Sequence, residues 1–285
     1  MSEKINILKS CNVCPHNCRI DRTQSADGVC GMSSELVISS YGPHFGEEPE
    51  LVGYFGSGTI FFTGCNLLCL FCQNYDISHL REGYGINEKR LTEIMLLLQE
   101  RGCSNINLVT PTHFTPQIIH AIEEAKIKDL NVPVIWNSSG YEKADTIRML
   151  EGIVDIYMPD IKFKNPDKCK LYTEADDYFT YASEAVMEMH RQVGDLIIKN
   201  GIARRGLLIR HLVLPNNQSD TKEIIDFVAE ELGEDTYFNL MEQYHPCFKA
   251  NGYPLISELI TKVEYEYFVN YAKKRGIKRP SYIFD

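Results

Sequence analysis

The chain has 285 residues, and its hydrophobic fraction of 44% and charged fraction of 24% are close to the averages of globular proteins. No apolar run approaches the roughly 20 residues that a membrane-spanning helix needs, so we expect no membrane partner. The formal net charge of −10 argues against broad binding to nucleic acid or anionic membranes, because both reward a basic protein surface.

Ten cysteines are the most informative feature of the composition. The first residues contain no apolar stretch followed by a small-residue cleavage site, so we find no export signal and expect a cytoplasmic protein. In a reducing compartment, thiols stay free of disulfides and tend to bind metals or to carry chemistry. Because seven of the ten cysteines fall in two clusters, each cluster is a candidate metal site.

The first cluster lies in a segment with few apolar residues. The stretch "CNVCPHNCRIDRTQSADGVC" spaces Cys11, Cys14, Cys18 and Cys30 as C-x2-C-x3-C-x11-C. Four thiolates make a complete ligand set for either zinc or a [4Fe–4S] cluster. Since this segment is too poor in apolar residues to fold on a core of its own, we predict a small metal-binding appendage over residues 1–58.

The second cluster follows the first predicted strand, residues 59–64. Within "GCNLLCLFCQN", Cys65, Cys69 and Cys72 are spaced C-x3-C-x2-C. Three thiolates can hold three irons of a cubane [4Fe–4S] cluster and leave the fourth iron open to a small molecule, whereas a structural zinc takes four ligands. The alternatives are a chance grouping and a zinc site completed from elsewhere in the chain.

Beyond this loop, helix-like and strand-like segments alternate. Apolar residues at helical spacing and terminal signals such as Gly233 predict the helices, and runs rich in Val, Ile, Phe and Tyr predict the strands. In chain order we predict a helix over 91–102, a strand over 106–110, a helix over 115–130, strands over 132–138 and 154–162, a helix over 183–194, a strand over 207–215, a helix over 220–233, a strand over 236–244 and a helix over 257–275.

This alternation indicates parallel βαβ units. The periodicity itself allows either a doubly wound open sheet or a full or partial (β/α) barrel. In both architectures the loops that follow the strands meet at the carboxyl ends of the sheet, where α/β proteins carry their chemistry. We therefore expect the three-cysteine loop and the other strand-end residues to form one site.

The motif "GCNLLCLFCQN" resembles the cluster-binding loop of the radical S-adenosylmethionine (radical SAM) enzymes, in which an aromatic residue precedes the last cysteine. Phe71 stands at that position. The resemblance implies a partial (β/α)6 barrel of the radical SAM type over residues 59–285 and a [4Fe–4S] cluster on the three cysteines, which would be the catalytic centre. It also implies S-adenosylmethionine on the open iron, with its adenine near Phe71. One electron then cleaves this cofactor to a 5′-deoxyadenosyl radical that abstracts hydrogen.

Other motifs are similar to relatives of the pyruvate formate-lyase activating enzyme. "TPTHF", "WNSSGYE" and "MHRQVG" match a subgroup of these relatives, and the likeness covers nearly the entire chain. The strand-end motifs "YMPDIKF" and "EQYHP" carry Lys162 and His245, which the resemblance places near the ribose and carboxylate of the cofactor. The strand "LIRHLVLP" is similar to another strand of the same enzymes.

The resemblance also implies a monovalent cation beside the cofactor carboxylate. The matching positions are Asn137, Ser138, the main-chain carbonyl of Met158, and Asp160. The activating enzymes have an aspartate where this chain has Asn137. Because this difference removes one negative charge, we expect a weakened or empty cation site.

A second departure lies at the end of the second predicted strand, where many radical SAM enzymes have Gly-Gly-Glu. This chain has Thr110, Thr112 and His113 there, so we expect a main-chain carbonyl or a threonine hydroxyl to contact the amino group of the cofactor. His113, together with Tyr141 and Cys247 on other strand-end loops, is also a candidate for substrate contact.

Two functions are compatible with these features. The first is an oxidoreductase that abstracts hydrogen from a glycine of a glycyl-radical enzyme, from another peptide or from a small molecule, with electrons from a donor such as flavodoxin or ferredoxin. The second is an iron–sulfur or zinc protein for electron transfer or scaffolding, without radical chemistry. The three-ligand loop and the strand-end motifs favour the first, because an electron carrier needs neither.

Overall fold

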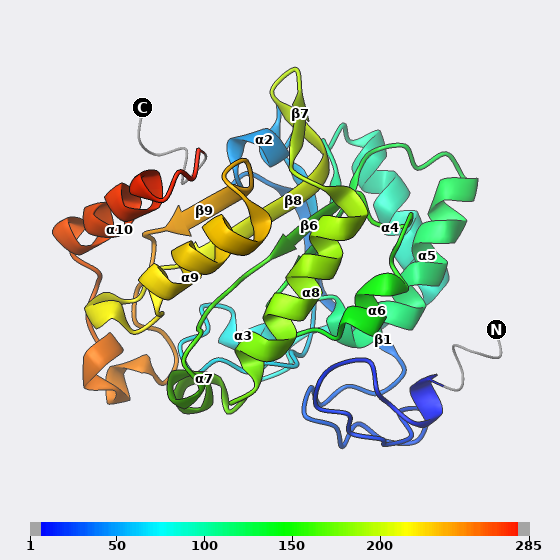
Figure 1. The fold of residues 1–285 in the computed structure, drawn as a ribbon. Helices are drawn as coiled ribbons and strands as arrows, with labels where there is room; N and C mark the ends of the chain where they lie inside the picture. Colours follow the sequence, from blue (N-terminus) through cyan, green and yellow to red (C-terminus); the bar gives the residue numbers. More distant parts are fainter. Residues whose placement is uncertain (1–6, 279–285) are drawn as a thin grey trace.

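The computed structural model describes residues 7–278, and one curved sheet lies at its centre (Figure 1). Neighbouring strands of its main body run parallel. They are β2 (Ser57–Phe62), β4 (Ile106–Val109), β5 (Val134–Ser138), β6 (Ile156–Pro159), β8 (Ile202–Leu212) and β9 (Tyr237–Met241), in that spatial order. All six correspond to predicted strands, although β8 begins five residues earlier than expected.

The strand order decides between the two architectures that the sequence left open. A doubly wound sheet reverses its strand order at a switch point. Here β2, β4, β5, β6, β8 and β9 follow one another without reversal. Among the described residues β9 pairs only with β8, so the sheet is not closed at that end. The predicted partial (β/α)6 barrel is therefore confirmed.

Three further strands run antiparallel to their neighbours. β1 (Leu36–His44) pairs with β2, β3 (Tyr84–Ile86) pairs with β1, and β7 (Ile197–Lys199) pairs with β8. β1 lies inside the segment 1–58 that the sequence assigned to a separate appendage. The fold divides that segment, because residues 36–44 belong to the barrel sheet whereas residues 7–35 contain no strand.

The short helix α2 (Pro49–Val52) also belongs to the barrel. It presents Leu51, which is completely buried against Ile135 of β5, Met158 of β6 and Leu208 of β8. These side chains belong to three neighbouring strands, so α2 fills the interior of the curved sheet. The chain between β1 and β2 thus supplies part of the barrel core.

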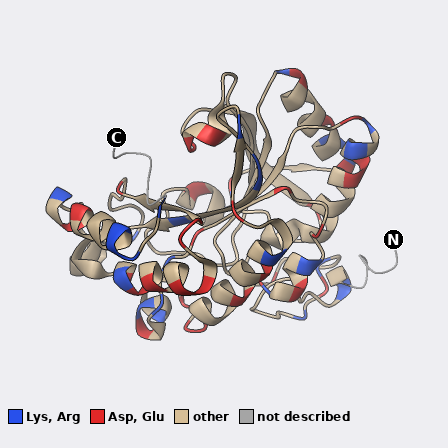
Figure 2. Ribbon diagram, turned by 45° about the horizontal axis from the view of Figure 1, so that its top comes forward, with Lys and Arg blue, Asp and Glu red and all other residues tan. Residues whose placement is uncertain are grey.

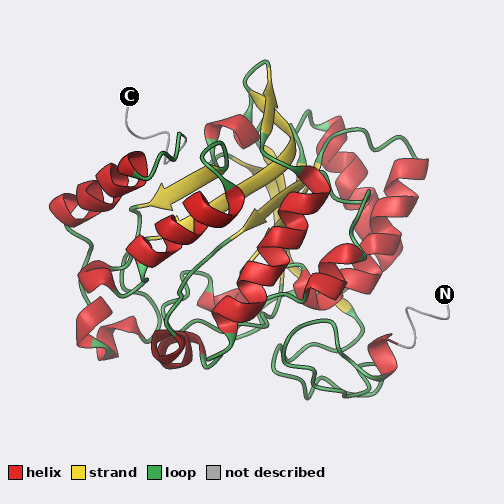
Figure 3. Cartoon of the chain, in the orientation of Figure 1, coloured by secondary structure: helices red, strands yellow, loops and turns green. Residues whose placement is uncertain are grey.

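Most of the remaining helices cover the outer face of the sheet and pack their apolar sides on it in the largest hydrophobic cluster of the molecule (Figure 3). They are α4 (Glu88–Glu100), α5 (Thr115–Ile127), α6 (Ala144–Arg148), α8 (Tyr178–Val193), α9 (Thr221–Phe227) and α10 (Lys262–Lys274). The short helix α3 (Tyr75–Ser78) follows the second group of cysteines, and α7 (Pro166–Thr173) packs in a second cluster that contains Phe71. Acidic and basic side chains are interspersed on these helices (Figure 2).

Several short turns complete the chain. They are η1 (Thr112–Phe114), η2 (Pro215–Asn217), the π-helical turn η3 (Val228–Leu232), η4 (Ala250–Gly252) and η5 (Pro254–Ile256). The turn at 254–256 explains why α10 begins at Lys262, capped by Thr261, and not near residue 257 as expected. Within residues 7–278, no helix is long and apolar enough to cross a membrane.

The side chains of Thr115 and Asp220, at the starts of α5 and α9, do not cap these helices, because they bond elsewhere. Thr115 is the first residue of α5 and its hydroxyl donates to the carbonyl of Thr112 at 2.6 Å. Asp220 does not cap α9. Instead it accepts from the backbone of Asn165 at 2.8 Å and pairs with Lys168 at 2.6 Å. Tertiary contacts with the loop before α7 outweigh the local capping geometry.

Candidate active site

The carboxyl ends of the parallel strands surround a cleft of about 260 Å³. All three cysteines of the second cluster line it, together with side chains from the ends of β5, β6, β8 and β9. Such an arrangement follows from the parallel topology, since every strand delivers its last residues to the same edge of the sheet. The predicted meeting of the cysteine loop with the strand ends is therefore observed.

The thiols lie on the loop between β2 and α3. The backbone N–H of Leu67 donates to Cys65 Sγ at 3.3 Å, and Ser78 Oγ lies 3.2 Å from Cys72 Sγ. Burial raises the pKa of Cys65 and of Cys69, so metal binding must displace their protons. These contacts help to fix the conformation of the loop.

The candidate metal ligands in the cleft are the thiols of Cys65, Cys69 and Cys72. Within residues 7–278, no three His, Cys, Asp or Glu side chains are grouped so that they could hold one metal ion as they stand. Three thiols along one wall of an open cleft fit the requirement of a cubane cluster, in which each of three irons takes one thiolate. The cleft provides the space that a molecule on the fourth iron needs.

Phe71 forms an apolar wall of the same cleft. Its ring makes edge contacts with Phe163, Tyr244 and Tyr172, at centroid distances of 5.9, 6.3 and 6.4 Å. Only 5% of the residue is exposed. Because three aromatic rings fix its orientation, Phe71 offers a rigid surface to a planar ligand.

Opposite this apolar wall lies a chain of charged groups. Lys162 Nζ is 2.6 Å from one oxygen of Asp160, and Arg210 Nε is 3.0 Å from the other. Arg210 also donates to Asn137 Oδ1 at 2.8 Å and pairs with Glu47 at 3.3 Å. Burial alone raises the pKa of Asp160, but Lys162 and Arg210 outweigh it and hold this pKa below its usual range. Asp160, Lys162 and Arg210 are therefore charged at neutral pH.

Acceptor oxygens at the positions that the resemblance assigns to a monovalent cation bond to protein side chains in the structure. Arg210 and Lys162 already occupy both oxygens of Asp160, and Arg210 takes the side-chain oxygen of Asn137. The hydroxyl of Ser138 donates to Glu142 at 2.7 Å. Cationic side chains thus satisfy the side-chain oxygens of Asp160 and Asn137, two of the positions that the resemblance assigned to a metal ion, and we assign no reaction step to such an ion.

Arg210 is a site residue that the sequence reasoning missed. It lines the cleft from β8, and the two residues before it in this strand, Leu208 and Ile209, are fully buried. An arginine inside a buried strand is costly unless it is paired. This anomaly in "LIRHLVLP" was the signal that could have identified it.

Glu142 is a second residue that the sequence reasoning did not single out. It is completely buried and accepts from Ser138, from Thr112 Oγ at 2.9 Å and from Trp136 Nε1 at 2.8 Å. Burial raises its pKa. By joining the turn after β4 to β5, Glu142 fixes Ser138, which lines the cleft, from behind.

The three predicted residues at the end of β4 separate in the structure. Thr110 lines the cleft in a left-handed conformation with φ of 57°. Thr112 bonds to Glu142, and His113 Nε2 lies 2.8 Å from the carbonyl of Thr63. Burial, and secondarily Arg22, lowers the pKa of His113 to about 3. The turn η1 directs Thr112 and His113 into the interior, so neither is among the residues that line the cleft.

The other predicted contacts lie beside the cleft or away from it. His245 is exposed and its Nδ1 is 3.2 Å from Nε2 of Gln73, a residue of the cleft wall. Tyr141 is buried and donates to Asp177 at 2.6 Å. Cys247 is half-buried outside the cleft wall. The structure therefore brings His245 to the rim, while Tyr141 and Cys247 are not among the residues that line the cleft.

The cysteines of the first cluster form a second group of free thiols. Cys11 and Cys14 are buried, and Cys18 and Cys30 are half-buried. Burial raises the pKa of Cys14 to about 12, and the thiols of Cys30, Cys11 and Cys18 act in the same direction. The four side chains are therefore close enough to influence one another electrostatically.

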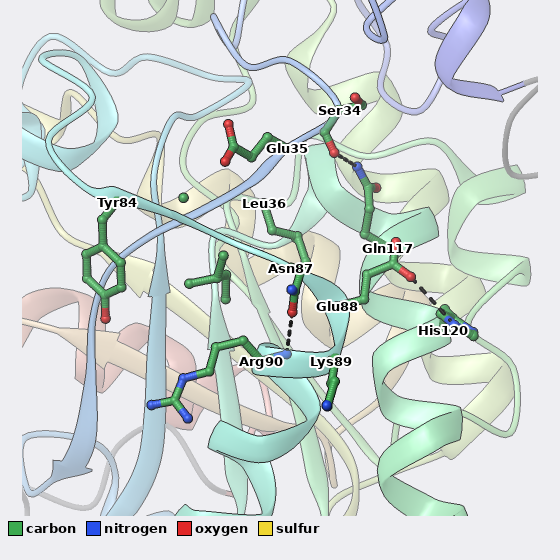
Figure 4. A pocket seen from close by; sticks show the side chains of 12 residues that line it. Ser34, Glu35, Leu36, Tyr84, Asn87, Glu88, Lys89, Arg90, Gln117 and His120 are labelled. Atoms are coloured by element: carbon green, nitrogen blue, oxygen red, sulfur yellow. Dashed lines mark hydrogen bonds and ion pairs between the residues drawn. The ribbon is translucent and has the colours of Figure 1, made fainter.

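A larger groove of about 940 Å³ lies at the outer edge of the sheet, beside β3 (Figure 4). There Gln117 donates to the carbonyl of Ser34 at 2.8 Å, and His120 lies 3.6 Å from Glu88. Its walls, as far as residues 7–278 form them, contain no cysteine. We therefore place the candidate active site in the smaller cleft.

Comparison with known proteins shows which family and which relatives the chain is similar to. The family model of the Radical SAM superfamily matches residues 59–228. The uncharacterized protein MJ0674 of Methanocaldococcus jannaschii is 34% identical over 280 residues, which cover 95% of this chain and 77% of that protein. The uncharacterized protein MJ0808 of the same organism is 24% identical over 263 residues, or 86% of this chain and 73% of that protein.

One solved structure shares the fold. The crystal structure of HydG, described as a maturase of the [FeFe]-hydrogenase, matches with a TM-score of 0.53 at 12% sequence identity. The match covers 75% of this chain and 48% of the HydG chain. The chain thus spans about half the length of that protein, and the likeness concerns the fold alone.

Proposed function

This chain belongs to the radical SAM superfamily, and we propose that it uses Cys65, Cys69 and Cys72 to hold the [4Fe–4S] cluster of that superfamily and abstracts a hydrogen atom from its substrate. When bound, the cluster and S-adenosylmethionine supply a 5′-deoxyadenosyl radical. The observation that carries the proposal is that the three thiols and Phe71 line one cleft at the carboxyl ends of the strands.

The charged wall of the cleft binds the polar end of the cofactor in this proposal. Lys162 and Arg210 present two positive charges for its carboxylate, and Asp160 fixes both of them. Asn137 and Ser138 complete this wall, and Thr110 supplies a polar contact for the amino group. Charge-assisted hydrogen bonds of this kind are the stronger ones in proteins, so they set the orientation of the cofactor.

The aromatic side of the cleft serves a different purpose. Phe71 packs against the adenine, while His245 reaches the cofactor from the rim. The segment after β9 closes over the cysteine loop, since the backbone N–H of Lys249 donates to the carbonyl of Leu70 at 3.0 Å and Phe248 stacks on Tyr75 at 5.1 Å. This cover excludes water from the neighbourhood of a reactive radical.

We propose further that the chain is an activating-enzyme-like member of the superfamily, supported by the strand-end motifs that supply Asp160, Lys162 and Arg210. Its candidate substrates are a glycine of a glycyl-radical enzyme, another peptide and a small molecule. A one-electron carrier such as flavodoxin or ferredoxin reduces it. The thiols of the appendage hold zinc or a second [4Fe–4S] cluster.

The direct test is cleavage of S-adenosylmethionine. Protein prepared without oxygen, reconstituted with iron and sulfide and reduced with dithionite should form 5′-deoxyadenosine. Cys69→Ala should abolish this product and the electron paramagnetic resonance (EPR) signal of the loop cluster, because one of three ligands is lost. Cys14→Ala should keep that signal. Absence of product from wild-type protein with an intact cluster contradicts the proposal.

A further inference from the structure

The cysteine-rich segment 7–35 rests directly on the loop that carries the other three cysteines. His16, which lies between Cys14 and Cys18, donates from Nε2 to the carbonyl of Asn66 at 2.7 Å. Asn66 is completely buried and follows Cys65 in the chain. One ligand-bearing turn of the segment is therefore joined by a hydrogen bond to the neighbour of a cluster ligand.

A second ligand-bearing turn contacts the other neighbour of Cys65. Gly64 has a φ of 82°, and a Cβ atom at this position would lie 2.9 Å from the carbonyl oxygen of Cys30 and 2.5 Å from the side chain of Met32. Only glycine allows so close an approach of the two backbones. Cys30 and Cys65 are thus separated by a single residue and one non-bonded contact.

These contacts are fixed by a buried arginine. Arg22, which is 1% exposed, donates to the carbonyls of Met32 and His113. His113 in turn bonds to the carbonyl of Thr63 at 2.8 Å. On the opposite side Thr146 of α6 donates to the carbonyl of Val13 at 2.6 Å. The segment is therefore held against the loop at several points and does not rest on one hinge.

Other contacts surround the loop only in part. Lys249 bonds to Leu70 and His79 Nε2 contacts the carbonyl of Cys69 at 3.0 Å, whereas Gln73 and Asn74 after Cys72 are exposed. The cysteine-rich segment also reaches the surface close to its own ligands, since Val29 beside Cys30 is 40% exposed. It connects the protein surface to the neighbours of Cys65.

We propose that Cys11, Cys14, Cys18 and Cys30 hold a second [4Fe–4S] cluster that passes electrons to the loop cluster across the Cys30–Gly64 and His16–Asn66 contacts. This inference rests on the proposed function, because it requires a loop cluster that must be reduced. Zinc has no redox chemistry and would leave both contacts with a purely structural role. The iron–sulfur form gives a use to their position next to Cys65.

The transfer is balanced by one external reductant. A reduced low-potential electron-carrier protein gives up one electron and is oxidised. The second [4Fe–4S] cluster, here called the surface cluster, accepts this electron and is reduced. The same electron then moves to the loop cluster, and the surface cluster returns to its oxidised state. No bond is formed or broken in the relay and no proton moves.

Metal content gives the first test. The full-length protein, reconstituted without oxygen, should contain about eight irons per chain, and the double variant Cys14→Ala/Cys18→Ala about four, because each cubane holds four. A natively purified wild-type protein with four irons and one zinc per chain would overturn the proposal.

Reduction kinetics give the second test. In stopped-flow mixing with reduced flavodoxin, the double variant should reduce its loop cluster about tenfold more slowly than wild type, equivalent to about 1.4 kcal/mol of barrier. Titanium(III) citrate, a small reductant that enters the open cleft, should reduce both proteins at the same rate. Equal rates with flavodoxin would contradict a relay.

The chain offers a matched pair of variants for the contact itself. His16 and His79 each bond through Nε2 to a carbonyl of the cysteine loop, but only His16 belongs to the cysteine-rich segment. His16→Phe should slow reduction by flavodoxin, whereas His79→Phe should not. Both should keep the midpoint potential of the loop cluster, measured by EPR-monitored titration. A slower rate together with a shifted midpoint potential would overturn the relay. His16 would then change the reduction potential of the loop cluster and would not lie on the path of electron transfer.

The relay and the proposed function fail separately in these experiments. If titanium(III) citrate reduces the loop cluster but no 5′-deoxyadenosine forms, the proposed function fails while the kinetic comparison still tests the relay. If wild type and the double variant form this product equally fast with flavodoxin, the relay is wrong and the proposed function stands.

Discussion

Arg210 shows at the scale of one residue how the cleft is organised. Its guanidinium bonds to the side chains of Asn137, Asp160 and Glu47, which come from two strands and from the loop before α2. Burial alone lowers the pKa of Arg210, but the carboxylates around it, Asp160 first, raise it above its usual range. The guanidinium of Arg210 therefore stands as a fixed positive charge at the cleft wall.

Asp160→Asn should weaken both the fold and the binding of the cofactor. The change leaves Lys162 and Arg210 buried without their common carboxylate, and the loss of one partner from a buried ion pair costs about 3–5 kcal/mol. Urea unfolding measures the loss of stability, and calorimetric titration of the reconstituted protein with S-adenosylmethionine measures the affinity. Asp167→Asn on the exposed first turn of α7 is the matched control, and an equal effect of both changes would contradict this role.

At the scale of elements, the segment between β1 and β2 is more than a connection. Leu51 of α2 fills the inside of the barrel, and Glu47 from the preceding loop reaches Arg210. Tyr237 of β9 donates to Glu50 at 3.0 Å and Asn239 donates to Glu48 at 2.8 Å. One short segment thereby joins the interior of the barrel to the base of the cleft.

Leu51→Ala should destabilise the protein by about 2–5 kcal/mol, because it opens a cavity in the barrel interior. The free energy of urea unfolding measures this effect. Leu259→Ala is a suitable control, since Leu259 is 63% exposed and its truncation creates no cavity. If the two variants lose the same stability, Leu51 does not support the barrel core.

At the scale of the whole molecule, stability depends on two buried histidines. Burial is the main cause that lowers the pKa of His113 to about 3 and that of His211 to about 4. His211 joins β8 to the end of β6, since Nδ1 lies 2.5 Å from the carbonyl of Ile161, and to α9, since Nε2 lies 2.9 Å from Thr221. Both imidazoles are neutral in the folded chain at neutral pH.

The protein should therefore lose stability as the pH falls below about 6.5, the ordinary pKa of histidine. In that range the unfolded chain binds a proton at each site and the folded chain does not, which costs about 1.4 kcal/mol per pH unit and histidine. The stabilisation is complete above pH 6.5 and is lost progressively toward pH 4 for His211 and pH 3 for His113. Urea midpoints between pH 7.5 and 5 measure the slope. His211→Gln should reduce it, and a flat profile in wild type would contradict the prediction.

The sequence by itself determined the six barrel strands, the loop with Cys65, Cys69 and Cys72, and the place of Asp160 and Lys162 at one strand end. These features are local, since side-chain periodicity and ligand spacing depend on a few neighbouring residues. They sufficed to predict that the thiols and the strand ends share one site.

Only the tertiary structure decided which side chains face that site. One turn after β4 directs Thr112 and His113 into the core, and Arg210 fills the place that the sequence assigned to a cation. The tertiary structure also joined β1 to the barrel and placed the four-cysteine segment against Gly64 and Asn66. These outcomes depend on contacts between residues far apart in the chain, where burial and charge pairing outweigh local preference.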